Sequence, residues 1–121
     1  PAYIDVGNLY YRKHDMDKAR EFYLKAAERM PFAAGAWINL GSVYLDKMEL
    51  QLAARLHEHA LKMNPRDAAA TFNLSQVYYK RGDYALADYY LRKAERLGFA
   101  PDPDYVKLIG QGLNTQAEKS D

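Results

Sequence analysis

The sequence predicts an all-α protein made of three tandem helix–turn–helix units of 34 residues, with one further helix after them. Two observations predict this fold class. A shift of 34 residues aligns small residues with small ones and large residues with large ones, and a helix-breaking pair recurs in the middle of each unit. The aligned columns are Val6, Leu40 and Leu74; Gly7, Gly41 and Ser75; Tyr10, Tyr44 and Tyr78; Ala19, Ala53 and Ala87; Ala26, Ala60 and Ala94; and Pro31 with Pro65.

The columns and the breakers together place the helices. We expect helices over residues 2–13, 17–30, 35–47, 50–63, 68–81 and 84–97. The breakers between paired helices are His14-Asp15, Met48-Glu49 and Gly82-Asp83. A glycine takes a left-handed turn without steric cost, an acidic residue suits the start of the next helix, and a proline ends the second helix of a unit. The small residues let two helices approach closely, and the tyrosines fill the space beside them.

A seventh helix is expected over residues 103–112. Asp102 precedes Pro103, which is the order of a capping residue and a proline at the first helical position. The side chains spaced to lie over the last unit are Tyr105, Val106, Leu108 and Ile109. Residues from about Gly112 onward are polar and unpatterned, so the sequence predicts a frayed tail there.

These columns resemble the tetratricopeptide repeat (TPR), whose signature is W-x2-L-G-x2-Y, then A-x3-F, then P. The middle unit carries most of it, as Trp37, Leu40, Gly41, Tyr44, Ala53 and Pro65. Three positions depart from the signature: His57 replaces the aromatic residue, Thr71 the tryptophan, and Phe99 the third proline. The resemblance implies a right-handed superhelical solenoid, with TPR units at 1–33, 34–67 and 68–101 and a capping helix and polar tail at 102–121.

The resemblance also implies where a ligand binds, because members of this family hold peptides in a concave groove lined by the first helices of the units. A stripe on a second face of these helices lies at those groove positions. Its members are Ile4, Asn8, Tyr11 and Arg12; Ile38, Ser42, Leu45 and Asp46; and Phe72, Gln76, Tyr79 and Lys80. Between this stripe and the packed face lies the column Asp5, Asn39 and Asn73, which we also assign to the groove. We expect a protein or peptide segment with apolar anchors as the ligand.

Two alternatives stay open for these residues. Asn39 and Asn73 offer donor and acceptor together, so they could grip a peptide backbone, or they could tie down neighbouring backbone of their own chain. The apolar members of the stripe, such as Ile4, Ile38 and Phe72, could instead be partly buried between first helices.

One subfamily that clamps the acidic C-terminal tails of chaperones can be compared position by position. Its cation, two asparagines and two further cations map, in groove order, onto Ile4, Asn8, Asn39, Ala69 and Asn73. None of the three cation positions holds a cation. The charge-assisted bonds to a tail carboxylate would be lost, so the sequence argues against chaperone-tail binding.

Composition excludes several other classes of function. The net charge of +1 gives no field that would attract nucleic acid, no apolar run is long enough to span a membrane, and there is no cysteine for thiolate chemistry. The lack of cysteine fits the cytoplasm and the periplasm equally. His57 and His59 are two residues apart, so their side chains diverge on a helix and cannot bind the same metal ion. We therefore expect no metal or cofactor. Because His57 occupies an aromatic position of the repeat, we expect it in the core. Gly110-Gln111-Gly112 is not a phosphate loop, because no strand or lysine accompanies it.

The sequence therefore favours a non-catalytic protein-interaction module, an adaptor or scaffold that holds a partner segment. One alternative is homotypic assembly through exposed end helices, which would make a homo-oligomer. Another is a regulatory segment of a larger protein with a catalytic or membrane-anchored part elsewhere. No capping side chain precedes the first helix, so we also expect further material upstream of Pro1.

Overall fold

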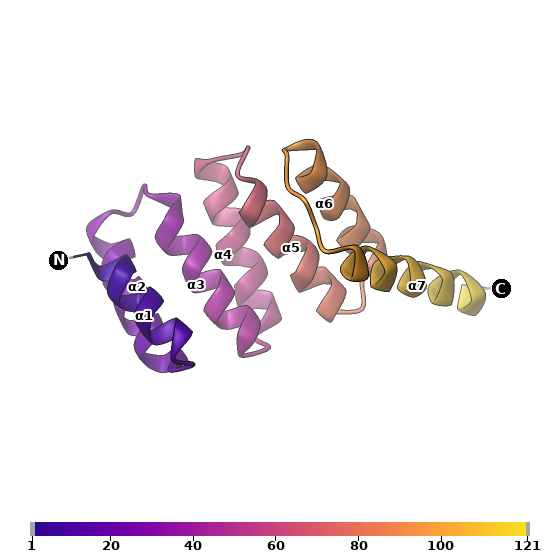
Figure 1. The fold of residues 1–121 in the computed structure, drawn as a ribbon. Coiled ribbons are helices and arrows are strands. Elements are labelled where there is room, and N and C mark those ends of the chain that lie inside the picture. The colour runs from indigo at the N-terminus through magenta and orange to yellow at the C-terminus, as the bar shows by residue number, and fades with distance from the viewer. Residues whose placement is uncertain (1, 121) are drawn as a thin grey trace. The chain divides into compact units, whose positions relative to one another are not determined.

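The fold is all-α over residues 2–120, which are the residues that the computed structural model describes (Figure 1). The helices are α1 (Tyr3–Arg12), α2 (Met16–Arg29), α3 (Ala34–Asp46), α4 (Leu50–Met63), α5 (Ala68–Lys80), α6 (Tyr84–Arg96) and α7 (Pro103–Ser120). The first six begin and end within one residue of the boundaries that the repeat predicts. The predicted all-α class of helix–turn–helix units is confirmed.

The chain forms two compact units, which we describe separately. The first reaches residue 65 and contains α1 to α4; the second begins at residue 66 and contains α5 to α7. In the first unit α1 pairs with α2, α2 with α3 and α3 with α4. In the second unit α5 pairs with α6, and α6 also contacts α7.

Each helix pair is closed at the small residue of its first helix. In the first pair the ring of Tyr23 lies over Gly7, where a Cβ atom would come within 2.5 Å of Tyr23 Cε1. In the second pair the ring of His57 lies over Gly41, where a Cβ atom would come within 2.6 Å of His57 Nε2. His57 is completely buried, as expected for a core residue. A ring that occupies the space of a missing side chain gives the close packing that protein interiors require.

The third pair closes with a hydrogen bond instead of a ring. Ser75 stands at the position of the two glycines and is completely buried. Its hydroxyl donates to the main-chain oxygen of Ala87 at 2.7 Å, and its oxygen also lies 2.9 Å from the hydroxyl of Tyr105. The buried hydroxyl is thus satisfied by partners on both other helices of its unit.

The turns inside the three pairs share one backbone conformation. His14, Met48 and Gly82 all have positive φ, at 62°, 61° and 80°. Only the third turn uses glycine, for which this region carries no steric penalty. Asp15 and Asp83 then cap the following helices, through carboxylate oxygens that accept from Lys18 N and Leu86 N.

The predicted frayed tail after Gly112 is wrong, because α7 continues to Ser120. The side chain that continues the packing is Leu113, which contacts the core formed by Ala87, Leu91 and Ile109. Further along, the amide of Gln116 donates to the main-chain oxygen of Gly82 at 2.9 Å. The helix is therefore held to the α5–α6 turn beyond its predicted end.

The predicted covering face of α7 is partly wrong as well. Ile109 is buried and Tyr105 packs against the core, as expected. Val106 and Leu108 remain 41% and 43% exposed. The buried face instead passes through Gly112, where a Cβ atom would come within 2.5 Å of the ring of Tyr84.

The positive φ at residues 14 and 82 predicts that introducing glycine at the first position and removing it from the second have opposite effects on stability. His14 is exposed and pays for a left-handed backbone that Gly82 adopts freely. We expect His14→Gly to raise the free energy of unfolding by roughly 0.5–1 kcal/mol, and Gly82→Ala to lower it by about 1 kcal/mol. Urea denaturation followed by circular dichroism measures both. A loss of stability in His14→Gly would contradict the strain argument.

Candidate functional site

Several predicted groove residues of the first unit meet in a hydrogen-bond network around Asn8. The hydroxyl of Tyr23, on α2, donates to Asn8 Oδ1 at 2.5 Å. The amide of Asn39, on α3, approaches the same oxygen at 3.4 Å. Both contacts use the carbonyl end of the Asn8 amide. The contacts at the oxygen end orient the amide group, whose nitrogen end is a hydrogen-bond donor.

A second contact joins the same two first helices one turn further along. The hydroxyl of Tyr11, on α1, donates to the carboxylate of Asp46 at the end of α3. Burial is the largest cause that raises the pKa of Tyr11, and the hydrogen bond to Asp46 adds to it. Burial also raises the pKa of Tyr23, against the opposing charge of Arg12. Both phenols thus stay protonated and act as donors.

These side chains enclose a small polar hollow of about 200 Å³. Its lining residues are Asn8, Tyr11, Tyr23, Asn39 and Ser42. Four of the five are predicted groove residues. The fifth, Tyr23, belongs to a second helix and was not predicted from the sequence as a site residue. A phenol long enough to reach past Gly7 is the signal that could have identified it.

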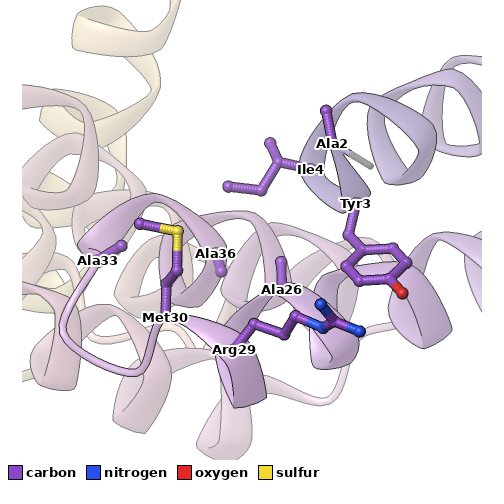
Figure 2. A pocket seen from close by; sticks show the side chains of 8 residues that line it. All are labelled: Ala2, Tyr3, Ile4, Ala26, Arg29, Met30, Ala33 and Ala36. Carbon is purple, nitrogen blue, oxygen red and sulfur yellow. The ribbon is translucent and has the colours of Figure 1, made fainter.

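A larger, mostly apolar hollow of about 420 Å³ lies at the other end of the same helices (Figure 2). Its lining residues are Ala2, Tyr3, Ile4, Ala26, Arg29, Met30, Ala33 and Ala36. Arg29 is the one charged residue of this lining, and its guanidinium carbon lies 5.3 Å from the centre of the Tyr3 ring. Met30 is 64% exposed, so apolar surface faces solvent at the rim.

Of this lining, only Ile4 was predicted as a site residue. Ala2 and Tyr3 lie at the start of α1 and Ala36 lies in α3, whereas the rest come from the end of α2 and from the linker to α3. The linker was predicted only as the boundary between two units. The linker composition is the signal that could have found them. The first linker reads Met30-Pro31-Phe32-Ala33, whereas the same four positions after α4 read Asn64-Pro65-Arg66-Asp67.

The remaining predicted residues of the first unit differ in accessibility. Leu45 is only 6% exposed and is placed in the core rather than on a ligand-accessible surface. Ile38 is half-buried, and its main-chain oxygen accepts from the hydroxyl of Ser42 at 3.2 Å. Asp5 and Arg12 are exposed.

In the second unit, two predicted residues pack against the C-terminal part of the chain. The ring of Phe72 stacks on Phe99 with centroids 4.3 Å apart, and meets Tyr105 edge-on at 5.2 Å. Tyr79 meets both Tyr84 and Tyr105 at 5.6 Å. Such aromatic contacts hold α7 in place. Asn73 and Gln76 are half-buried and Lys80 is exposed.

Other kinds of site find no support in the described part of the chain. Residues 2–120 contain no group of three or more histidine, cysteine, aspartate or glutamate side chains that could hold a metal ion. Within the same residues, no helix has the length and apolar character needed to cross a membrane.

Comparison with known proteins agrees with this geometry. The tetratricopeptide repeat family model matches residues 4–58 and 49–104. The first TPR domain of human RPAP3, solved by NMR, superposes with a TM-score of 0.88 at 18% identity, covering 97% of this chain and 94% of that one. The first TPR of Spaghetti (RPAP3), bound to the HSP90 peptide SRMEEVD, gives 0.85 at 18% identity, covering 93% and 90%. At this identity the likeness concerns the fold. Curated proteins give no significant match.

The Tyr11–Asp46 contact predicts a pH-dependent loss of stability on substitution. We expect Tyr11→Phe to lower the free energy of unfolding by about 1 kcal/mol at neutral pH, because it removes a partly exposed hydrogen bond to a carboxylate. Tyr11 ionises in the unfolded chain near its ordinary value of 10.0 and at a higher pH in the folded chain. The difference between the native protein and Tyr11→Phe should therefore be full below about pH 10 and shrink above it.

Urea denaturation at neutral and at alkaline pH measures this difference. Tyr89→Phe is the matched control, since Tyr89 is an exposed tyrosine on α6 and should change little at either pH. A Tyr11→Phe deficit that grows above about pH 10 would contradict the assignment.

Proposed function

The chain belongs to the tetratricopeptide repeat family, and on that premise we propose that it is a protein-interaction module. Its ligand is an extended segment of a partner protein, and the groove face of the first unit is the principal binding surface. The observation that carries this proposal is that an apolar hollow lined by Ile4 and a polar hollow lined by Asn8 follow each other along α1.

The spacing of the two hollows sets the form of the ligand. Ile4 lines the apolar hollow and Asn8 the polar one, and four residues of helix span about 6 Å. An extended chain advances about 3.3 Å per residue. A large apolar side chain seated beside Ile4 therefore brings the main chain about two residues further on to the amides of Asn8 and Asn39.

The polar hollow favours recognition of the main chain over recognition of a particular side chain. The amide nitrogen of Asn8 is oriented by its neighbours to donate, which suits a peptide carbonyl oxygen. Asn39 adds a second amide about one residue of extended chain away from that donor. The apolar hollow then supplies the side-chain preference, as in other grooves where an apolar anchor carries most of the affinity.

The charges on this face argue against an acidic tail as the ligand. The related Spaghetti domain binds the peptide SRMEEVD, which ends in acidic residues and a carboxylate. At the corresponding positions this chain has Ile4, Ala69 and Asn73 in place of cations. The face also carries Asp5 and Asp46, opposed by Arg12. We propose that Asn73, Gln76 and Lys80 form a separate polar binding surface of the second unit.

Selection of peptides from a random library displayed on phage tests the apolar-anchor proposal. We expect the selected peptides to share one large apolar residue. Met30→Glu should lower the affinity for these peptides by about tenfold or more, because it places a carboxylate at the rim of the apolar hollow. Asn39→Ala should weaken them by roughly two- to tenfold, the effect of one hydrogen bond. Fluorescence anisotropy with the full chain measures both.

The matched control is Leu52→Glu, the same kind of change at a residue of α4 that is 45% exposed and lines neither hollow. It should leave the affinity unchanged. Equal binding by Met30→Glu and the native chain, with the fold intact by circular dichroism, would place the ligand elsewhere.

The absent cations predict that the HSP90 peptide SRMEEVD binds this chain weakly or not at all. Three charge-assisted bonds, each contributing about 1.5–3 kcal/mol, have no donor here, so we expect a dissociation constant above about 1 mM. Isothermal titration calorimetry measures it. Micromolar binding would show that another part of the surface holds the acidic tail.

A further inference from the structure

Helix α7 carries the signature of a first helix, although the 34-residue columns do not reveal it. Val106, Ile109, Gly110 and Leu113 have the spacing of Trp37, Leu40, Gly41 and Tyr44 on α3. The match begins one residue later than the 34-residue period predicts, because the linker after α6 is two residues longer than the linker after α4, while α6 is one residue shorter than α4. Ile109 is buried, as Leu40 is. The helix is thus built like the opening helix of a further unit.

The first unit shows what normally covers this signature. The glycine of α1 lies under Tyr23 of α2, and the glycine of α3 lies under His57 of α4. In both second helices the ring is flanked by buried alanines four residues before it and three residues after it, which let the helix come close. These alanines are Ala19 and Ala26 on α2, and Ala53 and Ala60 on α4.

On α7 the corresponding surface is uncovered. A Cβ atom on Gly110 would meet nothing within 4 Å, and Val106 is 41% exposed. Leu113 packs against the Ala87–Leu91 core on one side and borders this surface on the other. The uncovered surface therefore continues the established interface between α6 and α7. We call Val106, Gly110 and Leu113 the α7 stripe.

We propose that the α7 stripe is a second binding site, distinct from the groove, which docks one amphipathic α-helix of a partner protein. The docked helix places a large ring over Gly110, as Tyr23 and His57 do over their glycines. We expect the docked helix to carry the sequence pattern Ala-x3-Ω-x2-Ala, in which Ω is an aromatic residue or histidine. Without such a ring, the notch that the missing side chain of Gly110 leaves on the surface of α7 stays open to solvent.

A second copy of this chain does not fit the stripe. The helices that carry the pattern, α2 and α4, already bury it within their own pairs. The stripe of another α7 offers a glycine where the notch needs a ring. Within the described residues, the chain after Leu113 continues α7 itself up to Ser120 and does not turn back over the stripe. A helix supplied by a different protein meets the requirement.

The test uses the isotopically labelled full chain and a synthetic peptide that copies residues 15–31. Joining the side chains of Glu21 and Lys25, which are 3.7 Å apart on the exposed side of α2, by a lactam keeps the peptide helical. We expect the amide signals of Val106, Gly110 and Leu113 to shift and to approach saturation at about 1 mM peptide. The same peptide with Tyr23→Ala should bind about tenfold more weakly.

Two variants of the chain separate docking from folding. Gly110→Leu fills the notch and should weaken peptide binding by about tenfold, while the melting temperature stays the same or rises because Gly110 has no close neighbour. Gln111→Leu adds the same side chain at an exposed position off the stripe and should leave binding unchanged.

Three results would overturn the proposal. The first is the absence of shifts on α7 at several millimolar peptide. The second is shifts confined to α1 and α3, which would mean that the peptide only replaces the chain's own α2. The third is a concentration-dependent mass in sedimentation that Gly110→Leu abolishes, which would make a second copy the occupant.

Discussion

The close approach of two helices at a single small residue is the constraint on which the first unit depends. Gly7 accepts the Tyr23 ring and Gly41 accepts the His57 ring, and any side chain at either glycine would overlap that ring. This contact also builds the site. The Tyr23 ring fills the core, while its hydroxyl passes the glycine and fixes the amide of Asn8. One residue thus couples the packing of α1 on α2 to the orientation of a donor in the groove.

The equivalent contact has a different chemistry in each pair, so the groove face is not a simple repeat. A histidine ring has no hydroxyl at its tip, and Ser42, which corresponds to Asn8, donates to its own helix at Ile38. In the third pair the hydroxyl belongs to Ser75, and it points to Ala87 and Tyr105 inside the unit. Among the described helix pairs, only the first has a core tyrosine whose hydroxyl donates to a predicted groove side chain, that of Asn8. This difference is why the polar hollow lies where it does.

The sequence was sufficient to predict the helices but not the contacts of the surface residues, and one physical reason explains both results. Helix boundaries depend on local features that recur every 34 residues, such as Asp83 after Gly82, and these predicted six helices within one residue. Surface contacts depend on neighbours that do not recur. Phe72 corresponds to Ile4 and Ile38 by period, but it packs on Phe99 and Tyr105, which only the third pair meets. The apolar hollow likewise owes its rim to a linker whose composition is not repeated. The extension of α7 is held by the packing of Leu113 and by the contact of Gln116 with Gly82, neither of which recurs in the other pairs.

A helical glycine without a close contact distinguishes the α7 stripe from the proposed groove. A glycine inside a helix costs about 1 kcal/mol relative to alanine, and the fold normally recovers this cost through a close contact. Gly7, Gly41 and Gly112 all have such contacts, each with a ring from a neighbouring helix. Gly110 lies inside α7 with no neighbour near its missing side chain, so nothing within its own unit offsets the cost. A docked helix would offset it. The proposed groove needs no such partner geometry, because the main chain that its amides are proposed to contact is presented by every extended segment. We therefore expect the two proposed surfaces to differ in selectivity: the groove should tolerate any sequence beyond one apolar anchor, whereas the α7 stripe should require a ring at one position.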